Sequence, residues 1–358
     1  MSERGVNIYS WLIILMFSYH RRLILLGLLV LLLSACLPAA PPSNLPDFPT
    51  PQPLGLSPAK PLPPGQPIQT DNWTIEVRQF LRGEAAWKML AAANSNNEPL
   101  PAGEEYVLIQ FHLQNNSADP EEKSIGLALT GSRRVRYNSF DARVVTPQPY
   151  LQSSLPGGGE MDGWYAYRVG QGETDLLLVV DNYEDEILYA ALTENAAVIV
   201  PVAELSAIQA TDLGQSLAAA APYKEPVTTT GWQVRVTDVV QGDTAWEMVR
   251  EANQFNDPPP DGMMYVAVKL WARYIGLNED GESIDEFMFD LANERGKTWE
   301  RPSVIPPLPD LTRHLYPGGE TEGWLVLTAP ADGRNLILVF TPHNRSETRY
   351  LSLLEYGR

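Results

Sequence analysis

The sequence predicts a mainly β protein made of two tandem antiparallel β-sandwiches, each with one short helix after its first strand. One block of sequence occurs twice at a constant offset: Trp232, Trp246 and Tyr265 repeat Trp73, Trp87 and Tyr106, since 232 − 73, 246 − 87 and 265 − 106 each give 159. An ungapped repeat of this length indicates a tandem duplication of one domain. Within each copy, short apolar segments alternate with turn residues, which is typical of a β-sandwich.

The order of residues at the N-terminus is that of a secretory signal peptide. The basic segment His20-Arg21-Arg22 is followed by an apolar run over 23–33, then by Ser34, Ala35 and Cys36, the one cysteine of the chain. Leu33 to Cys36 resembles the bacterial lipobox. The resemblance implies that residues 1–35 are a lipoprotein signal peptide and that lipid on Cys36 anchors the protein at the outer face of the bacterial cell membrane or envelope. Met16 is an alternative start.

The alternative for this segment is an uncleaved anchor helix over 11–33. That helix would carry Arg21 and Arg22 in its middle, where each costs about 2.5–3.5 kcal/mol on insertion scales. The apolar run after Arg22 is also shorter than the roughly 20 residues that span a bilayer. We therefore favour the signal peptide.

Composition divides the rest of the chain into two domains and two connecting segments. Residues 36–69 are rich in proline, which favours an extended, semi-rigid tether behind the lipid. The first domain is expected over 70–205 and the second over 229–358. Residues 206–228 are expected to link them.

Alternation and turn residues predict about seven strands in each copy. Strands are expected over 73–80, 106–113, 124–130, 163–169, 176–180, a weaker one over 143–145, and around Tyr189; their counterparts begin at Trp232 and cover 265–272, 283–289, 323–328, 336–340 and Tyr350. Alanine-rich segments with apolar residues three and four apart predict helices over 83–93 and 243–252. We expect Trp87 and Trp246 to be mostly buried, because they recur on the apolar face of these helices.

The two copies resemble a known domain family in the order of their motifs. Each has a strand, a helical segment ending in Asn and Pro, Gly-x-x-Tyr-Val, and a Pro-Gly-Gly turn followed by Glu and Gly-Trp. This order is similar to the immunoglobulin-like, telokin-like domain of bacterial lipoproteins and secreted immunogenic proteins, whose function is unknown. The resemblance covers 70–195 and 229–356. It implies an immunoglobulin-like sandwich, and no catalytic residues come with it.

The charge of the chain argues against nucleic acid as a partner. The formal net charge is −18, so no basic face is available for nucleic acid.

Ser57-Pro-Ala-Lys60 matches the Ser-x-x-Lys pattern of some nucleophilic enzymes, but it lies in the tether and not on a helix. We therefore expect no enzymatic activity.

The sequence also predicts no metal or cofactor site. His20, His112, His314 and His343 lack ligand spacing. The glycines at 157–159 and 318–319 are interpreted as turns, because no helix or Lys-Ser/Thr follows them. The acidic segments 181–186 and 278–286 depart from the calcium-loop pattern and are interpreted as solvated loops, although weak calcium binding stays open.

The remaining candidates for ligand binding are aromatic. Tyr137, Tyr150 and Trp299 are less clearly core residues than the other aromatics, and the last two lie near Pro-rich loops, where binding residues often occur. For all three, an ordinary half-buried aromatic is the simpler interpretation. The leading hypothesis for function is a lipid-anchored extracytoplasmic binding or scaffolding module without catalysis. The alternative is an accessory of a hydrolase or transferase system that recognises envelope glycan, and the partner is another envelope protein or a glycan.

Overall fold

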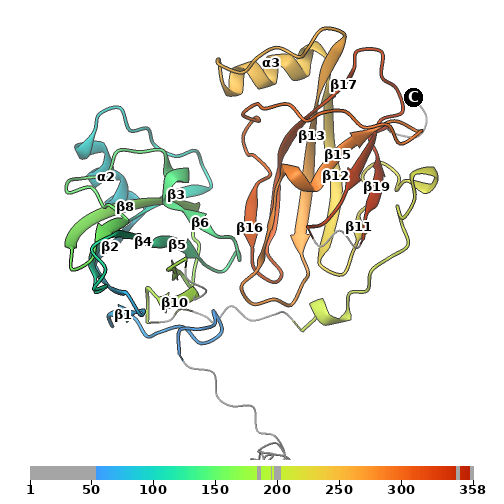
Figure 1. Cartoon of the computed structure of the whole chain (residues 1–358). Helices are drawn as coiled ribbons and strands as arrows, with labels where there is room; N and C mark the ends of the chain where they lie inside the picture. The colour runs from blue at the N-terminus through green and yellow to red at the C-terminus, as the bar shows by residue number, and fades with distance from the viewer. Residues whose placement is uncertain (1–53, 184–186, 195, 197–202, 344–346, 355–358) are drawn as a thin grey trace, which may run out of the picture. The chain divides into compact units, whose positions relative to one another are not determined.

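The computed structural model describes residues 54–183, 187–194, 196, 203–343 and 347–354 (Figure 1). Cys36, the predicted signal peptide and the tether as far as residue 53 lie outside this range. The described chain is mainly antiparallel β-structure with two α-helices. The predicted fold class is therefore confirmed. We call residues 54–196 repeat 1 and residues 211–354 repeat 2.

Repeat 1 contains two four-stranded sheets. The first has the order β1 (Ile68–Gln69), β2 (Trp73–Arg82), β3 (Glu104–Asn115) and β8 (Glu160–Gly170). The second has the order β10 (Ile187–Ala191), β9 (Leu177–Asp181), β5 (Gly126–Thr130) and β6 (Tyr137–Asn138). A ribbon of β4 (Glu122–Ser124) and β7 (Ser154–Pro156) and a 3₁₀ turn, η1 (Ser139–Ala142), complete the repeat.

Repeat 2 follows the same plan. Its first sheet has the order β11 (Val227–Thr228), β12 (Trp232–Gln241), β13 (Met263–Tyr274) and β17 (Glu320–Pro330). Its second contains β15 (Phe289–Ala292), β18 (Ile337–Phe340) and β19 (Arg349–Ser352), and its ribbon pairs β14 (Glu282–Ile284) with β16 (Arg313–Leu315). Three further 3₁₀ turns are η2 (Leu205–Ala207), η3 (Leu217–Ala219) and η4 (Glu286–Met288).

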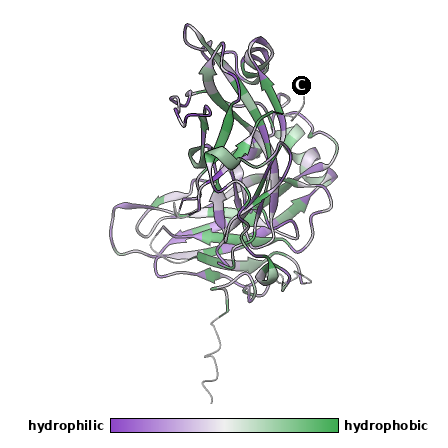
Figure 2. Cartoon of the chain, turned by 90° about the vertical axis from the view of Figure 1, so that its right-hand side faces the viewer, coloured by the Kyte–Doolittle hydropathy of each residue, from purple (hydrophilic) through white to green (hydrophobic). Residues whose placement is uncertain are grey.

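The central strand of each repeat shows why the two layers form. In β3, side chains alternate between the two faces of the sheet, as in any strand. Ile109, Phe111 and Leu113 are fully buried in the core between the two sheets. Tyr106 and Leu108 point to the opposite face, where they meet the helix. The hydrophobic colour along the strands in Figure 2 follows from this burial of both faces.

The helices α2 (Glu84–Ala93) and α3 (Asp243–Ala252) form as predicted, and each packs through small residues. Ala86 and Leu90 of α2 are fully buried against the first sheet. Trp87 is only half-buried; its ring stacks on Tyr106 with centroids 6.0 Å apart. Ala245, Val249 and Trp246 repeat this arrangement in α3. Both tryptophans are thus partly buried, while their alanine neighbours make the fully buried contact with the sheet.

One predicted strand is a loop, and the reason lies in a repeated asparagine. The side chain of Asn97 donates to the carbonyls of Leu90 and Val145, both at 2.8 Å, and accepts from the Val145 N–H at 2.9 Å. Residues 143–145 are thus held to the end of α2 and do not join a sheet. Asn256 binds Val249 and Ile305 in the same way in repeat 2.

Trp87→Ala should lower the stability of repeat 1 by about 1–2 kcal/mol, below the range of about 3–5 kcal/mol for a fully buried tryptophan. The half-buried ring loses its stacking on Tyr106, while the buried contacts of Ala86 and Leu90 remain. Urea denaturation followed by circular dichroism measures the difference. Ala86→Leu is the matched comparison: it overpacks a fully buried site and should cost more than Trp87→Ala. The reverse order would contradict this packing.

The Pro-rich segment before the first strand is part of repeat 1 from residue 55 onwards. The Leu62 N–H donates to the Tyr189 carbonyl at 2.8 Å, and the Tyr189 N–H donates to the Gly55 carbonyl at 2.7 Å, so this segment adds a parallel partner to β10. In repeat 2, Tyr350 binds Gly214 and Ala221 in the same manner. The duplication therefore reaches into the segments assigned to the tether and the linker, with the offset of 159 unchanged (214 − 55 and 221 − 62).

The two repeats are joined by a short antiparallel bridge between Val135 and Leu315. The Arg136 N–H donates to the His314 carbonyl and the Tyr316 N–H donates to the Arg134 carbonyl, both at 2.9 Å. Val135 enters the core of repeat 2, whereas Tyr316 packs on Ala128, Leu177, Val179 and Tyr189 of repeat 1. Each repeat thus contributes a side chain to an apolar cluster of the other.

His314 should make the stability of this contact pH-dependent. Burial lowers the pKa of its imidazole, and the charge of Arg136 lowers it further. A hydrogen bond with the Asp280 backbone raises the pKa but does not cancel these effects. Because the pKa is lower in the folded than in the unfolded chain, stability should be complete above about pH 6.5 and decrease as the pH falls below it. Urea denaturation at pH 7.5 and 5.5 measures the loss. His314→Gln, which does not titrate, should reduce the difference, and an equal difference in the variant would exclude His314 as the cause.

Candidate functional site

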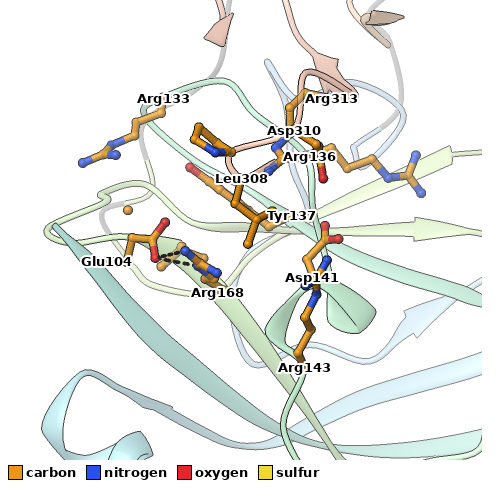
Figure 3. A pocket seen from close by; sticks show the side chains of 13 residues that line it. Glu104, Arg133, Arg136, Tyr137, Asp141, Arg143, Arg168, Leu308, Asp310 and Arg313 are labelled. Atoms are coloured by element: carbon orange, nitrogen blue, oxygen red, sulfur yellow. Dashed lines mark hydrogen bonds and ion pairs between the residues drawn. The ribbon is translucent and has the colours of Figure 1, made fainter. Parts of the chain in front are cut away.

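A cleft with a volume of about 350 Å³ lies where repeat 1 meets a loop of repeat 2 (Figure 3). Five arginines and three carboxylates line it, together with Tyr137, the end of one strand of repeat 1 and the loop of repeat 2. We call it the arginine cleft; its charged residues are Arg133, Arg136, Arg143, Arg168, Arg313, Glu104, Asp141 and Asp310. Cavities of this size suit small ligands.

Two neighbouring strands form the floor of the cleft. Arg168 lies near the end of β8, and Glu104 is the first residue of β3, which pairs with β8 along its length. The Arg168 Nε donates to Glu104 Oε2 at 2.5 Å. This ion pair is drawn as dashed lines in Figure 3. Among the described residues, the other N–H groups of the guanidinium have no partner.

A buried carboxylate behind the cleft positions two of its lining residues. Glu173, which has 1 % of its surface exposed, accepts from the Tyr137 hydroxyl at 3.0 Å and from the Arg133 backbone N–H at 2.7 Å. The Arg133 Nε lies 3.2 Å from the same carboxylate. Burial raises the pKa of Glu173, against these hydrogen bonds and the nearby arginines. Tyr137 and Arg133 are therefore held in place from within repeat 1.

Repeat 2 closes the other side of the cleft through residues 308–313. The Arg313 guanidinium donates to Asp310 Oδ1 at 2.7 Å and to the Thr312 carbonyl at 2.6 Å. Across the cleft, burial raises the pKa of Asp141, and the charge of Asp310 adds to this effect while Arg313 opposes it. The cleft is thus complete only when both repeats contribute.

Arg143 and Arg136 differ from the other arginines in their pairing. Within the described part of the chain, the exposed side chain of Arg143 makes no hydrogen bond or ion pair, and its backbone adopts φ +51° after η1. Arg136 Nε is buried without a hydrogen-bond partner among the described residues, although another nitrogen of this guanidinium lies 3.5 Å from Asp181. These two arginines keep donors that the protein does not use.

Repeat 2 has a pocket of about 370 Å³ at the corresponding place, but its chemistry is different. Strand registers relate the positions: Tyr106 pairs with Arg168, and Tyr265 pairs with Thr328. The hairpin registers place Trp299 where repeat 1 has Tyr137. Thr130 and Ala292 are equivalent, because they pair with Leu177 and Ile337, the first residues of β9 and β18. Ala292 bridges Thr298, and Leu129, the residue before Thr130, pairs with Tyr137, so Trp299 and Tyr137 are equivalent. Glu104, Arg136 and Arg168 thus correspond to Met263, Thr298 and Thr328. Arg143 corresponds to Ser303, because Asn97 and Asn256 bind Val145 and Ile305 in the same way, two residues further on. Arg136, Arg143 and Arg168 therefore have no arginine counterpart in repeat 2.

The three aromatic candidates fall in three different environments. Tyr137 lines the arginine cleft and packs against the cores of both repeats. Trp299 is half-buried in the corresponding pocket of repeat 2, with Tyr265 and several prolines, and its indole N–H has no partner among the described residues. Tyr150 is 50 % exposed and contributes to neither pocket. The structure therefore does not bring the three together.

Sequence reasoning did not identify the arginines of the cleft. A local signal was present, because three of the four residues from Arg133 to Arg136 are arginines in a strongly acidic chain. The other members come from strands and loops far apart in the sequence, and Arg313 comes from the other repeat. Only the fold brings them to one place.

Other candidate residues have structural contacts. Ser57 is buried and donates from its hydroxyl to Glu279 of repeat 2. The His343 Nε2 lies 3.1 Å from Asp285. Over the described ranges, no group of three His, Cys, Asp or Glu side chains is arranged to hold a metal ion, and no helix is long and apolar enough to cross a membrane.

Comparisons with known proteins add a fold neighbour. No family model matches the chain, and no curated protein matches it significantly. Among solved structures, the chain is similar to an uncharacterized β-sandwich protein from Clostridium difficile 630, at 10 % identity. The match covers 41 % of this chain and 100 % of that protein, with a TM-score of 0.24.

Proposed function

We propose that this chain is a lipid-anchored extracytoplasmic module that binds a ligand or partner without catalysis. The observation that carries the proposal is the arginine cleft, a cavity of about 350 Å³ to which both repeats contribute. Its polar residues include ion pairs and free N–H donors, which suit binding and orientation of a ligand. The lipobox resemblance at Cys36 supplies the anchor in this proposal, and the resemblance of each repeat to telokin-like domains of lipoproteins agrees with it.

The anchor can be tested at one residue. Cys36→Ala should remain as an unprocessed precursor and should not incorporate labelled palmitate, because the thiol that accepts the lipid is absent. Radiolabelling of bacteria that express the full chain, followed by gel electrophoresis, measures both outcomes. Ser34→Ala is the matched control, since it keeps a small residue before the cysteine and should label normally. Palmitate incorporation by Cys36→Ala would contradict the lipid anchor.

A second candidate is supported by the pocket at Trp299. This pocket combines an indole, a tyrosine and several prolines, and flat aromatic faces are suited to stacking on sugar rings. In this candidate the chain is an accessory that recognises envelope glycan for a hydrolase or transferase system. A peptidoglycan pull-down with the full chain and with Trp299→Ala tests it. Retention that disappears in Trp299→Ala but persists in Tyr137→Ala would favour this candidate over the arginine cleft.

A further inference from the structure

We infer that the arginine cleft binds a small ligand rich in oxyanions, with carboxylate or phosphate groups. This inference rests on the proposed binding function and names its ligand class. It concerns the cleft of repeat 1 and not the Trp299 pocket.

The arginine cleft carries more hydrogen-bond donors than acceptors. Each guanidinium carries five N–H donors and no acceptor, whereas an ionised carboxylate only accepts, through about four lone-pair sites. Five arginines and three carboxylates line the cleft. The donors therefore exceed what the lining carboxylates accept, even with Glu173 and Asp181 pairing to Arg133 and Arg136 from behind. A ligand that completes the network must be rich in acceptors.

The unused donors lie on three arginines that line the cleft. Arg143 is exposed on the rim, and within the described chain it makes no ion pair. Among the same residues, one nitrogen of Arg313 is bound, by Asp310 and Thr312, and its other nitrogens have no partner. Arg133 keeps about half of its side chain exposed (53 %) while Glu173 holds its Nε. Three guanidiniums from two repeats thus have N–H groups left for a bound ligand. Planar guanidiniums bind carboxylate and phosphate in a bidentate manner.

The two repeats differ at three positions that carry arginines of the cleft. Where repeat 1 has Arg136, Arg143 and Arg168, repeat 2 has threonine or serine. The same sandwich folds with either set, so the fold does not require these arginines. Their concentration in one cleft of a chain with a net charge of −18 is explained by a ligand that needs them.

Repeat 2 also supplies the variants for the test. Arg143→Ser and Arg168→Thr introduce the residues that the second copy carries at the same places. Arg295→Ala is the control, because it removes an exposed arginine of repeat 2 at the position that corresponds to Arg133, outside the cleft. Isothermal titration of the full chain in detergent, at low and moderate salt, would use citrate, inorganic phosphate and trigalacturonate, with maltotriose as the neutral probe.

At least one of the three anions should bind, with an affinity that falls as salt increases, and maltotriose should not bind. Arg143→Ser and Arg168→Thr should each weaken binding about tenfold or more, because each removes charge-assisted hydrogen bonds to the anion. Arg295→Ala should bind as the wild type. Preference for trigalacturonate or for citrate over phosphate would identify a carboxylate ligand, and the opposite order a phosphate ligand.

Two results would overturn the inference. One is the absence of binding by all three anions; the other is binding that Arg143→Ser and Arg168→Thr leave unchanged. If maltotriose binds while all three anions do not, the first result leaves the proposed binding function in place, because the site then takes a neutral glycan. Failure of the binding function itself would instead appear as no retention of any envelope component by the wild-type chain.

Discussion

Tyr316→Ala should lower the free energy of unfolding by about 3–5 kcal/mol, the range for truncation of a large buried side chain. The side chain has no exposed surface and lies across the repeat boundary on Ala128, Leu177, Val179 and Tyr189. Its ring meets Tyr189 edge-on with centroids 6.2 Å apart. Because the residue belongs to repeat 2 and its contacts to repeat 1, the loss should destabilise the association of the two repeats. Differential scanning calorimetry of the full chain measures it.

The control for this substitution is Tyr316→Phe, which keeps the ring. It should stay much closer to the wild type than the alanine variant. If the two variants melted at the same temperature, the ring would not be the source of the stability. If Tyr316→Ala melted with the wild type, the contact between the repeats would contribute nothing.

Glu173→Ala should be the second most damaging change, with a cost of about 3 kcal/mol. It leaves the Tyr137 hydroxyl and the Arg133 backbone N–H without their acceptor and removes the partner of the Arg133 guanidinium. Tyr137 and Arg133, which both line the arginine cleft, would lose the carboxylate that holds them in place. Chemical denaturation measures the loss of stability, and titration with the anions that bind the wild type measures the effect on the cleft.

Glu173→Gln is the informative control, because the amide keeps an acceptor and resembles the protonated acid. Since burial raises the pKa of Glu173, the carboxyl contributes most to stability below its unfolded pKa, and that contribution decreases as the pH rises through the folded pKa. The glutamine variant should therefore match the wild type best at low pH. A difference that is largest at low pH would contradict the raised pKa.

Much of the fold could be predicted because the sequence contains the same domain twice. The constant offset of 159 located the first strand, the helix and the central strand of each copy. The structure has these elements at the predicted places, because tertiary packing there agrees with the local patterns. The segment 143–145 was mistaken for a strand because its valines suit one. A distant side chain, Asn97, binds it to a helix end instead.

The site was harder to predict, for a physical reason. Tyr137 was identified as a candidate by elimination, yet its relation to Trp299 was hidden, because the offset between these two residues is 162 (299 − 137). The ion pairs of the cleft join residues that are far apart in the chain, such as Arg168 and Glu104. No periodicity or motif reports a contact of that kind. Backbone register, which requires the folded sheet, is what reveals it.

The bridge between Val135 and Leu315 bears on self-association. It joins unlike surfaces of the two repeats, and a head-to-tail contact of this kind can in principle continue from one molecule to the next. The hairpin register places Lys297, which is exposed, where repeat 1 has Val135 (297 − 135 = 162). The turn register places Pro156 where repeat 2 has Tyr316. Gly158 and Gly318 donate in the same way to the carbonyls of Asn115 and Tyr274, and Pro156 and Tyr316 each lie two residues before these glycines. If the contact continued to a second molecule, Lys297 would have to be buried and Pro156 would stand in the place of Tyr316. These two differences between the repeats oppose fibre growth through this contact.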